Sequence, residues 1–275
     1  MSVHHITKLS VVLSVPEDAP GALSQPLTHR ASSIGPYLQG VIMGQIQSAY
    51  ADHLHQLSFN PYSQYCCKDD SAKSLIWNVS ALTDEAAEQV IEPLRKMDLI
   101  ELKSLGISLP IVSKSTYTIN VETLLKSIYD DGETKADIQF LTPTAFKSRK
   151  AYVFMPTSRL LFQNLLMHYE QVYGKGSDIE EETLSYIEQH AKIVSYNLRS
   201  HYFANAAGKN KRIPAFIGSA SFRFDGSPAM AGLARMLLKF SEYAGIGIKT
   251  AMGMGGVKCT FEANTGTPVI GGGID

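Results

Sequence analysis

Cysteine is scarce in this chain, with three in 275 residues, and that number is too small for a disulfide framework. Cys66 and Cys67 are adjacent and Cys259 is distant, so they cannot form a tetrahedral zinc site without histidine ligands. We therefore expect reduced thiols, no metal and no cofactor.

Long hydrophobic runs are also missing. No apolar stretch approaches the roughly 18 residues of a membrane-spanning helix. The N-terminal sequence MSVHHITKLSVVLSV lacks a basic region followed by a cleavable apolar core. The composition, 44% hydrophobic and 19% charged, is that of a globular protein of one large or two ordinary domains. We expect a soluble, unexported, cytoplasmic protein with no membrane partner.

The usual phosphate-binding fingerprints are absent as well, although residues 245–256, GIGIKTAMGMGG, are rich in glycine. Lys249 follows Ile248 rather than glycine, so the segment is not a Walker-type loop. It follows a predicted helix and precedes a predicted strand, the reverse of a dinucleotide-binding turn. Glycine of this density allows close approach of the backbone to a flat or anionic ligand, but it also suits an ordinary flexible connection.

The net charge of −1 hides a strong asymmetry. Residues 191–258 contain ten basic and two acidic side chains, so this part carries +8 and the remainder carries −9. Segregated positive charge is typical of a polyanion-binding protein. The basic residues are Lys192, Arg199, Lys209, Lys211, Arg212, Arg223, Arg235, Lys239, Lys249 and Lys258.

Alternating and helical apolar patterns in the first half predict the order β-α-β-β-α-β, which is the ferredoxin-like arrangement. The expected elements are a strand over 6–15, a helix over 36–54, strands over 62–67 and 74–79, a helix over 83–97, and strands over 100–102 and 107–119. The first helix should end before Asn60-Pro61, because the residue before proline disfavours helical geometry.

A similar pattern begins again after a polar interval at 129–137. The expected elements are strands over 138–146 and 151–154, a helix over 158–173 capped by Thr157 or Ser158, a helix start at 178–182, strands over 196–204 and 215–224, a helix over 228–243, and a strand over 257–261. We therefore predict an α+β fold of two tandem ferredoxin-like, RRM-like domains, at 1–130 and 131–275. Such sheets are often used for single-stranded RNA. The aromatic residues of the second half are expected to pack in its core (Tyr196, Tyr202, Phe203, Phe222 and Phe224).

Several stretches in this order resemble the CRISPR-associated endoribonucleases that cut precursor CRISPR RNA within its repeats, members of the RAMP superfamily. The stretches are LQGVIMGQI from Leu38, HLHQ at 53–56 leading to NPYSQY, FLTPTAFKS from Phe140, YVFMPTSRLLFQNLL from Tyr152, and FSEYAGIGIKTAMGMGG from Phe240. The resemblance implies tandem ferredoxin-like domains and a role in antiviral defence. It also implies CRISPR repeat RNA, as a single strand or a stem-loop, as the partner.

The implied chemistry is metal-independent cleavage of RNA. The ribose 2′-OH attacks the adjacent phosphorus and leaves a 2′,3′-cyclic phosphate and a 5′-OH. Such a step asks for a base, an acid and groups that stabilise the phosphorane charge. Histidine suits both proton roles because its unperturbed pKa of about 6.5 lies near working pH.

The family's catalytic histidine follows a leucine near the end of the first helix, and His55 matches that position. His53 is an alternative to His55 rather than its partner. Residues two apart on a helix point about 200° away from each other, so both rings cannot face one phosphate equally well. A packing or solvated histidine in a weak member of the family is the remaining reading. Met43 and Asn60 stand where some members carry a tyrosine and a lysine. The auxiliary candidates are Tyr50, Tyr37, His29 and Lys68, and Tyr50 lies on the apolar stripe, where burial is expected.

The resemblance also implies that the glycine loop and nearby basic residues hold the repeat. The predicted RNA-binding residues are Gly245, Gly247, Lys249, Gly253, Gly255, Gly256, Lys209, Lys211 and Arg212. Arg235 and Lys239 share a helix face that lies near RNA or faces solvent. His55 and the loop should then meet across the junction of the halves.

Two other functions stay open from sequence: a RAMP subunit that grips CRISPR RNA without cutting it, and a small-molecule nucleotide enzyme. Association with subunits of an interference complex and homodimerisation are open too.

Overall fold

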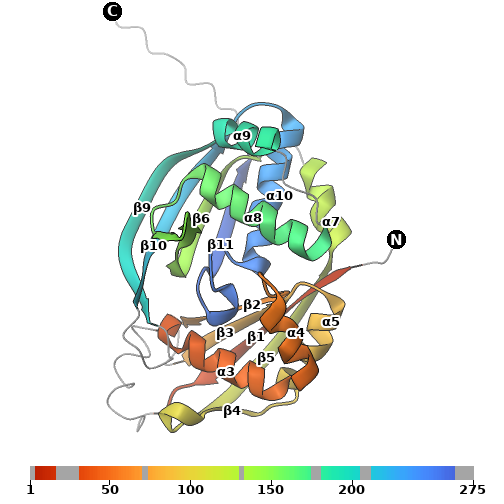
Figure 1. The fold of residues 1–275 in the computed structure, drawn as a ribbon, viewed down its shortest axis with the longest axis vertical. Helices are drawn as coiled ribbons and strands as arrows, with labels where there is room; N and C mark the ends of the chain where they lie inside the picture. Colours follow the sequence, from red (N-terminus) through yellow and green to blue (C-terminus); the bar gives the residue numbers. More distant parts are fainter. Residues whose placement is uncertain are drawn as a thin grey trace, which may run out of the picture.

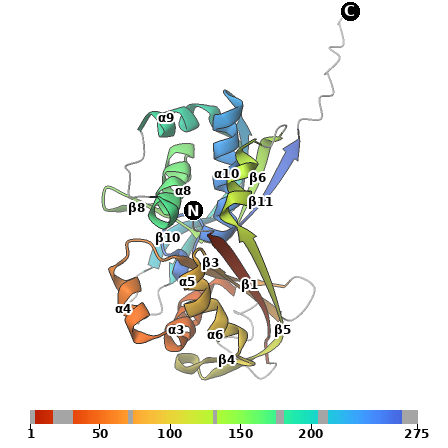
Figure 2. The ribbon, with the colours of Figure 1, turned by 90° about the vertical axis from the view of Figure 1, so that its right-hand side faces the viewer.

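The computed structural model describes residues 4–16, 31–69, 74–129, 133–174, 181–204 and 212–263. Figure 1 shows two sheet-and-helix halves, the N-terminal one below and the C-terminal one above. In Figure 2, α3, α4 and α8 lie on one side of the molecule, and β1, β5, β6 and β11 lie on the other.

The N-terminal half is built on a five-stranded sheet in the order β2-β3-β1-β5-β4, and all its pairs are antiparallel. Its strands are β1 (His5–Ser14), β2 (Tyr62–Lys68), β3 (Ser74–Ala81), β4 (Leu99–Leu102) and β5 (Ile107–Asn120). Its helical segments are η1 (Ala31–Ile34), α3 (Gly35–Gln45), α4 (Ser48–Gln56), α5 (Asp84–Ala86), the π-helical turn η2 (Ala87–Ile91), α6 (Glu92–Arg95) and η3 (Lys103–Leu105). Without β4, the sheet has the ferredoxin-like order.

The C-terminal half repeats this order as β11-β6-β10-β9. Its strands are β6 (Glu133–Thr144), β9 (Ala191–Ala204), β10 (Arg212–Phe224) and β11 (Val257–Ala263), and a small hairpin joins β7 (Phe146–Ser148) to β8 (Ala151–Val153). Its helices are α8 (Ser158–Tyr173), α9 (Glu181–His190) and α10 (Pro228–Ala244), and η5 (Thr250–Met252) lies inside the glycine loop. The expected fold of two tandem ferredoxin-like halves is confirmed.

The connection between the halves is itself packed. α7 (Val121–Lys126) and η4 (Ser127–Tyr129) lie after β5, and Val121 and Leu124 are buried in the core of the C-terminal half. Residues 130–132, where we place the boundary between domains 1–130 and 131–275, lie outside the described residues, so that division stays a prediction.

Three local expectations are wrong. The single helix predicted over 36–54 is two helices, because Gln47 is extended (φ −65°, ψ 143°) between α3 and α4. β6 begins at Glu133, inside the polar interval at 129–137, rather than at residue 138. Tyr196 and Tyr202 are each 61% exposed rather than packed in the core; both lie on β9, the edge strand of its sheet, on which Phe203 is buried. Phe203, Phe222 and Phe224 are buried, as expected.

The helix caps follow the sequence signals. Thr157 caps α8, and its hydroxyl accepts a hydrogen bond from the Leu160 amide at 3.2 Å. Ser227 caps α10 in the same way, with proline at the next position. Within the described residues, no helix combines the length and apolar character needed to cross a membrane.

Candidate functional site

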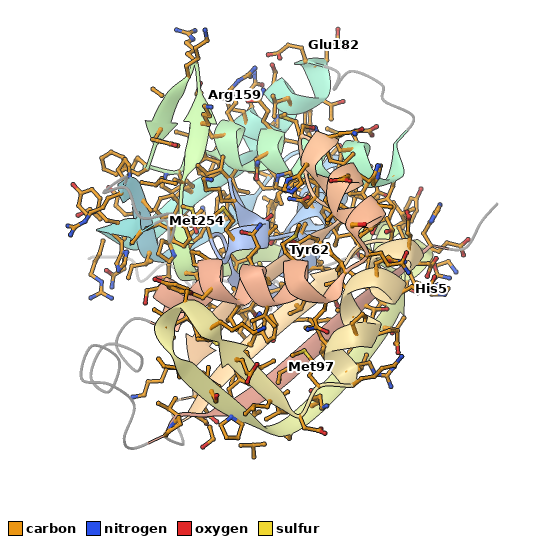
Figure 3. The ribbon with its side chains drawn as sticks, turned by 60° about the horizontal axis from the view of Figure 1, so that its bottom comes forward. His5, Tyr62, Met97, Arg159, Glu182 and Met254 are labelled. Atoms are coloured by element: carbon orange, nitrogen blue, oxygen red, sulfur yellow. The ribbon has the colours of Figure 1, made fainter. Side chains whose placement is uncertain are left out.

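The glycine loop at 245–256 lies between the two halves. Figure 1 shows it in blue directly above α3, and Figure 3 shows Met254 of the loop and Tyr62 of β2 near the centre of the molecule. The buried side chain of Gln64 in β2 donates to the carbonyl oxygens of Gly35 (2.8 Å) and Ala251 (3.2 Å). The loop is therefore hydrogen-bonded to the N-terminal half although it belongs to the C-terminal one.

The five glycines of the loop are all buried, and their amides already donate to acceptors within the protein. The acceptors for Gly245, Gly247, Gly253, Gly255 and Gly256 are respectively Ser241 O, Asn164 Oδ1, Thr250 O, Pro143 O and Thr142 Oγ1. Contact of these five glycines with RNA remains a prediction. Lys249 is half-buried and is the one charged side chain of the loop, so it can meet a ligand without breaking these bonds.

A cavity of about 550 Å³ opens beside Lys249. It is lined by residues of the glycine loop, of α8, of the β7–β8 hairpin and of the segment after α4, with Lys147, Arg149 and Lys249 as its cations. None of its lining residues within the described part of the chain is a carboxylate. The cavity therefore favours an anionic ligand.

The tip of the β7–β8 hairpin is an additional basic element that our sequence reasoning missed. Lys147, Arg149 and Lys150 are exposed, and the last two have positive φ angles of 48° and 68° that close the turn. The sequence signal was present: two short apolar runs flank SRK in FKSRKAYV, which is a strand-turn-strand pattern with a cationic tip.

The candidate catalytic histidines lie on the last turn of α4. Tyr50 and Leu54 are buried and anchor this helix, and His53 and His55 are both exposed. His55 is not among the residues that line the cavity, but Ser58 and Phe59, three and four positions later, are. The segment after α4 and the glycine loop thus line one cavity at the junction of the halves, and the contact of His55 itself with this site stays a prediction.

Tyr50 is buried, as its place on the apolar stripe predicted, and burial raises the pKa of its hydroxyl far above the usual range. Among the described residues, this hydroxyl has no hydrogen-bond partner. Tyr50 therefore has a packing role. Because the pKa of its hydroxyl lies far above neutral pH, it is poorly suited to donate or accept a proton in the reaction.

The other sequence candidates are dispersed. Lys68 is exposed at the end of β2, and Arg212 is exposed at the start of β10. Arg235 is buried, so the expectation that it faces RNA or solvent is wrong. Lys239 lies over the Phe261 ring, 5.2 Å from its centroid. His29, Lys209 and Lys211 lie outside the described residues.

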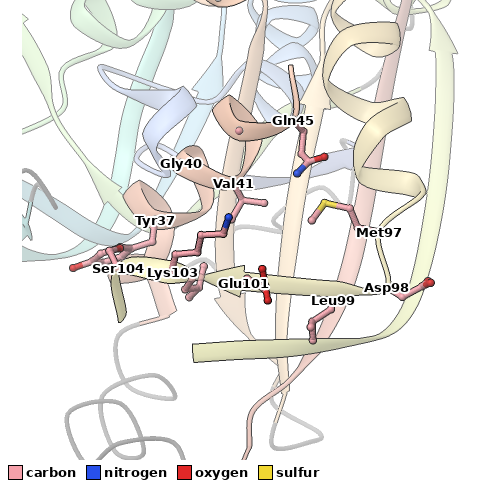
Figure 4. Close-up of a pocket in the computed structure, with 12 residues that line it drawn as sticks. Tyr37, Gly40, Val41, Gln45, Met97, Asp98, Leu99, Glu101, Lys103 and Ser104 are labelled. Carbon is pink, nitrogen blue, oxygen red and sulfur yellow. The ribbon is translucent and has the colours of Figure 1, made fainter. Parts of the chain in front are cut away.

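A second and larger cavity, about 680 Å³, lies between α3 and β4 (Figure 4). Tyr37 lines this cavity rather than the one beside Lys249. Its charged lining residues are Asp98, Glu101 and Lys103, so it has more negative than positive charge. We place the candidate site in the smaller cavity, since its cations suit a polyanion and it contacts the segment after His55.

His168 of α8 is a site residue that the sequence analysis did not identify. Its ring stacks on Phe59, with centroids 3.8 Å apart and planes at 16°. Burial lowers the pKa of His168 to about 3, so the ring is neutral at ordinary pH. Within the described part of the chain, no group of three or more His, Cys, Asp or Glu side chains is placed to hold a metal ion.

Fold and site together define a class: a protein of two ferredoxin-like halves with a cationic cavity at their junction. A sequence model of the CRISPR-associated endoribonuclease Cas6 family matches residues 138–257. A CRISPR-associated endoribonuclease Cas6 of Streptococcus thermophilus is 34% identical over 233 residues, covering 84% of this chain and 93% of the relative. One from Mycobacterium tuberculosis is 35% identical over 257 residues, covering 92% of this chain and 78% of the relative. The chain belongs to the CRISPR-associated endoribonuclease Cas6 family.

Solved structures agree in fold. A Cas6 product complex superposes with a TM-score of 0.70 at 18% identity, covering 94% of this chain and 100% of the other. A Cas6 in complex with a substrate mimic gives 0.66 at 16% identity, covering 93% and 99%. A Thermus thermophilus Cas6 gives 0.65 at 20% identity, covering 94% and 100%.

Proposed function

We propose that this protein cleaves precursor CRISPR RNA within its repeats and releases mature CRISPR RNA. The observation that carries the proposal is the cationic lining of the cavity that Lys249 shares with the segment after His55, in which no described residue is a carboxylate. Family membership supports RNA cleavage as the activity. The names of two similar structures, a substrate-mimic complex and a product complex, support repeat RNA as the ligand.

The proposed reaction needs no metal. A base takes the proton of the ribose 2′-OH, the O2′–P bond forms, the P–O5′ bond breaks, and an acid protonates the departing 5′ oxygen. The products are a 2′,3′-cyclic phosphate and a 5′-OH. We assign one of the two proton transfers to His55, and His53 is the alternative on the same turn of α4. The exposed position of both rings leaves them open to RNA.

The cations have a separate role. Lys249, Lys147 and Arg149 line one cavity, so their positive charge falls on a phosphate bound there. Negative charge grows on that phosphate in the transition state, and fixed cations stabilise it more strongly in a partly desolvated site. The exposed hairpin tip extends the same charge outward to neighbouring phosphates.

Protein partners follow from the same reading. One similar structure, with a TM-score of 0.56 and 11% identity, is described as a partial Cas6-RT-Cas1–Cas2 complex, and this chain covers 48% of that chain. We propose that the protein can act in association with other CRISPR proteins. Sedimentation would measure directly whether it also associates with itself.

The test uses labelled repeat RNA in EDTA, beside an RNA whose scissile 2′-OH is deoxy, with His55→Ala and His53→Ala as variants. We expect cleavage in EDTA, none of the deoxy RNA, and a loss of at least about 100-fold in His55→Ala, a typical contribution of a proton-transfer group. Cleavage that requires magnesium, or that survives the deoxy substitution, refutes the mechanism. Binding without cutting favours an RNA-gripping subunit, and loss in His53→Ala alone moves the assignment to His53.

A further inference from the structure

One face of α8 contacts both segments that form the candidate site. Asn164, His168 and Gln171 stand at positions i, i+4 and i+7, a spacing that brings side chains to the same side of a helix. All three line the cavity beside Lys249. The helix belongs to the C-terminal half, yet this face touches residues of both halves.

The first contact of this face is to the glycine loop. Asn164 Oδ1 accepts a hydrogen bond from the Gly247 amide at 2.6 Å, two residues before Lys249. The amide nitrogen of Asn164 then faces His168 Nε2 at 3.1 Å. Because Asn164 can only donate from this nitrogen, Nε2 must be unprotonated, in agreement with a ring that burial keeps neutral.

The second contact is to the segment after α4. His168 stacks on Phe59, and the Gln171 amide donates to Ser58 Oγ at 3.0 Å. Phe59 also packs against the core of the C-terminal half. Because α4 ends at Gln56, these two contacts fix the path of the chain immediately after the turn that carries His55.

We infer that Asn164 and His168 are positioning residues, which together hold Lys249 and the His55 segment at a fixed separation across the junction of the halves. The inference rests on the proposed function, because it matters to cleavage only if His55 transfers a proton. A misplacement of about 1 Å can lower a rate by about 100-fold, so two side chains that together contact both segments can strongly affect the rate of the chemical step.

The test separates the two contacts of His168. His168→Phe keeps a ring to stack on Phe59 but removes the acceptor for Asn164, and His168→Gln keeps an acceptor but removes the ring. Asn164→Ala removes the bond to Gly247. Tyr169→Phe, at the adjacent position of the same helix and with its ring against Phe240, is the control.

We expect single-turnover cleavage of repeat RNA to fall about tenfold in each of the three variants and about 100-fold in His168→Ala, which loses both contacts. Repeat-RNA Kd should stay within about threefold, because Lys249, Lys147 and Arg149 are retained. The midpoints of the pH–rate profile should not move. Rates like that of the control, or a shifted profile that makes His168 a proton-transfer group, would overturn the inference.

A readout independent of cleavage keeps this test apart from the proposed function. Hydrogen exchange, followed by mass spectrometry, should become at least about tenfold faster in peptides covering 57–60 and 245–249 in His168→Ala, with little change in β1 or β5. If wild type fails to cut RNA, the proposed function fails, and the exchange result still decides the positioning role. Unchanged exchange in both peptides refutes it.

Discussion

The side chain of Gln64, in the N-terminal sheet, donates a hydrogen bond to the carbonyl oxygen of Ala251 in the glycine loop, 3.2 Å away. Gln64 is only 1% exposed, and Trp77 Nε1 donates to its carbonyl oxygen at 2.9 Å. A loop whose composition suggests ligand binding is thus fastened to the opposite half of the protein. The glycines allow the loop to pack at this junction, and Lys249 is half-buried within the same loop.

Replacing Gln64 by leucine should destabilise the protein. The change leaves Trp77 Nε1 and the carbonyl of Ala251 buried without the Gln64 side chain and removes its bond to the Gly35 carbonyl, and each unsatisfied buried group costs about 1–3 kcal/mol. We expect the free energy of unfolding in urea to fall by about 3 kcal/mol or more. Gln45→Leu, the same change at an exposed position of α3, should stay within about 0.5 kcal/mol. Equal effects of the two changes would contradict a junction role for Gln64.

Two glycines should respond in opposite directions to alanine. Gly253 has φ of 98°, and a Cβ there would lie 2.9 Å from the Gly35 Cα of the other half. We expect Gly253→Ala to lower the free energy of unfolding by at least about 2 kcal/mol through strain and separation of the halves. Gly40 is helical with open space around its Cβ, so Gly40→Ala should raise it by about 0.5–1 kcal/mol. Thermal and urea denaturation of both variants measure the difference.

Local patterns were sufficient to predict both ferredoxin-like halves, because strand alternation and helical periodicity depend only on residues that are close in sequence. The break between α3 and α4 escaped because apolar positions continue through it, although Ile46 and Gln47 are extended. The start of β6 was not predicted because ETKAD is mostly polar, although Lys135, Ala136 and Asp137 pair with both β10 and β11.

The site was harder to predict because its contacts are long-range. Glycine density announced a close approach, but not that the partner would be the protein's own Gly35 and Gln64. Similarly, a histidine within an apolar helix such as α8 is usually a packing residue. Nothing in the neighbouring sequence connects His168 to Phe59, which lies 109 positions earlier. Which strand forms the edge of a sheet also depends on the assembled topology, and so does which side chains of that strand, such as Tyr196, stay exposed.

Burial of His168 predicts that the protein loses stability in mild acid. The unfolded chain binds a proton near pH 6.5, whereas the folded protein resists it down to a pKa of about 3. The unfolded state therefore binds more protons below pH 6.5, and the free energy of unfolding should fall by about 2 kcal/mol from pH 7.5 to 5 through this residue. Urea denaturation across that range should show a correspondingly smaller fall in His168→Phe. Parallel curves for the two proteins would mean that His168 binds a proton as readily in the folded state as in the unfolded state.

The cations around the smaller cavity predict a specific salt dependence of RNA binding. Each phosphate contact adds about 0.7 to the slope of log affinity against log salt for a single strand. We expect Lys249→Ala and Arg149→Ala each to lower that slope by about this amount and to weaken repeat-RNA binding at low salt, since both side chains line the cavity. Lys103→Ala removes the same charge from the more acidic cavity between α3 and β4, and should change neither quantity. Filter binding at several salt concentrations gives both values. Equal losses in all three variants would mean that RNA senses only net charge, and a loss in Lys103→Ala alone would move the RNA to the larger cavity.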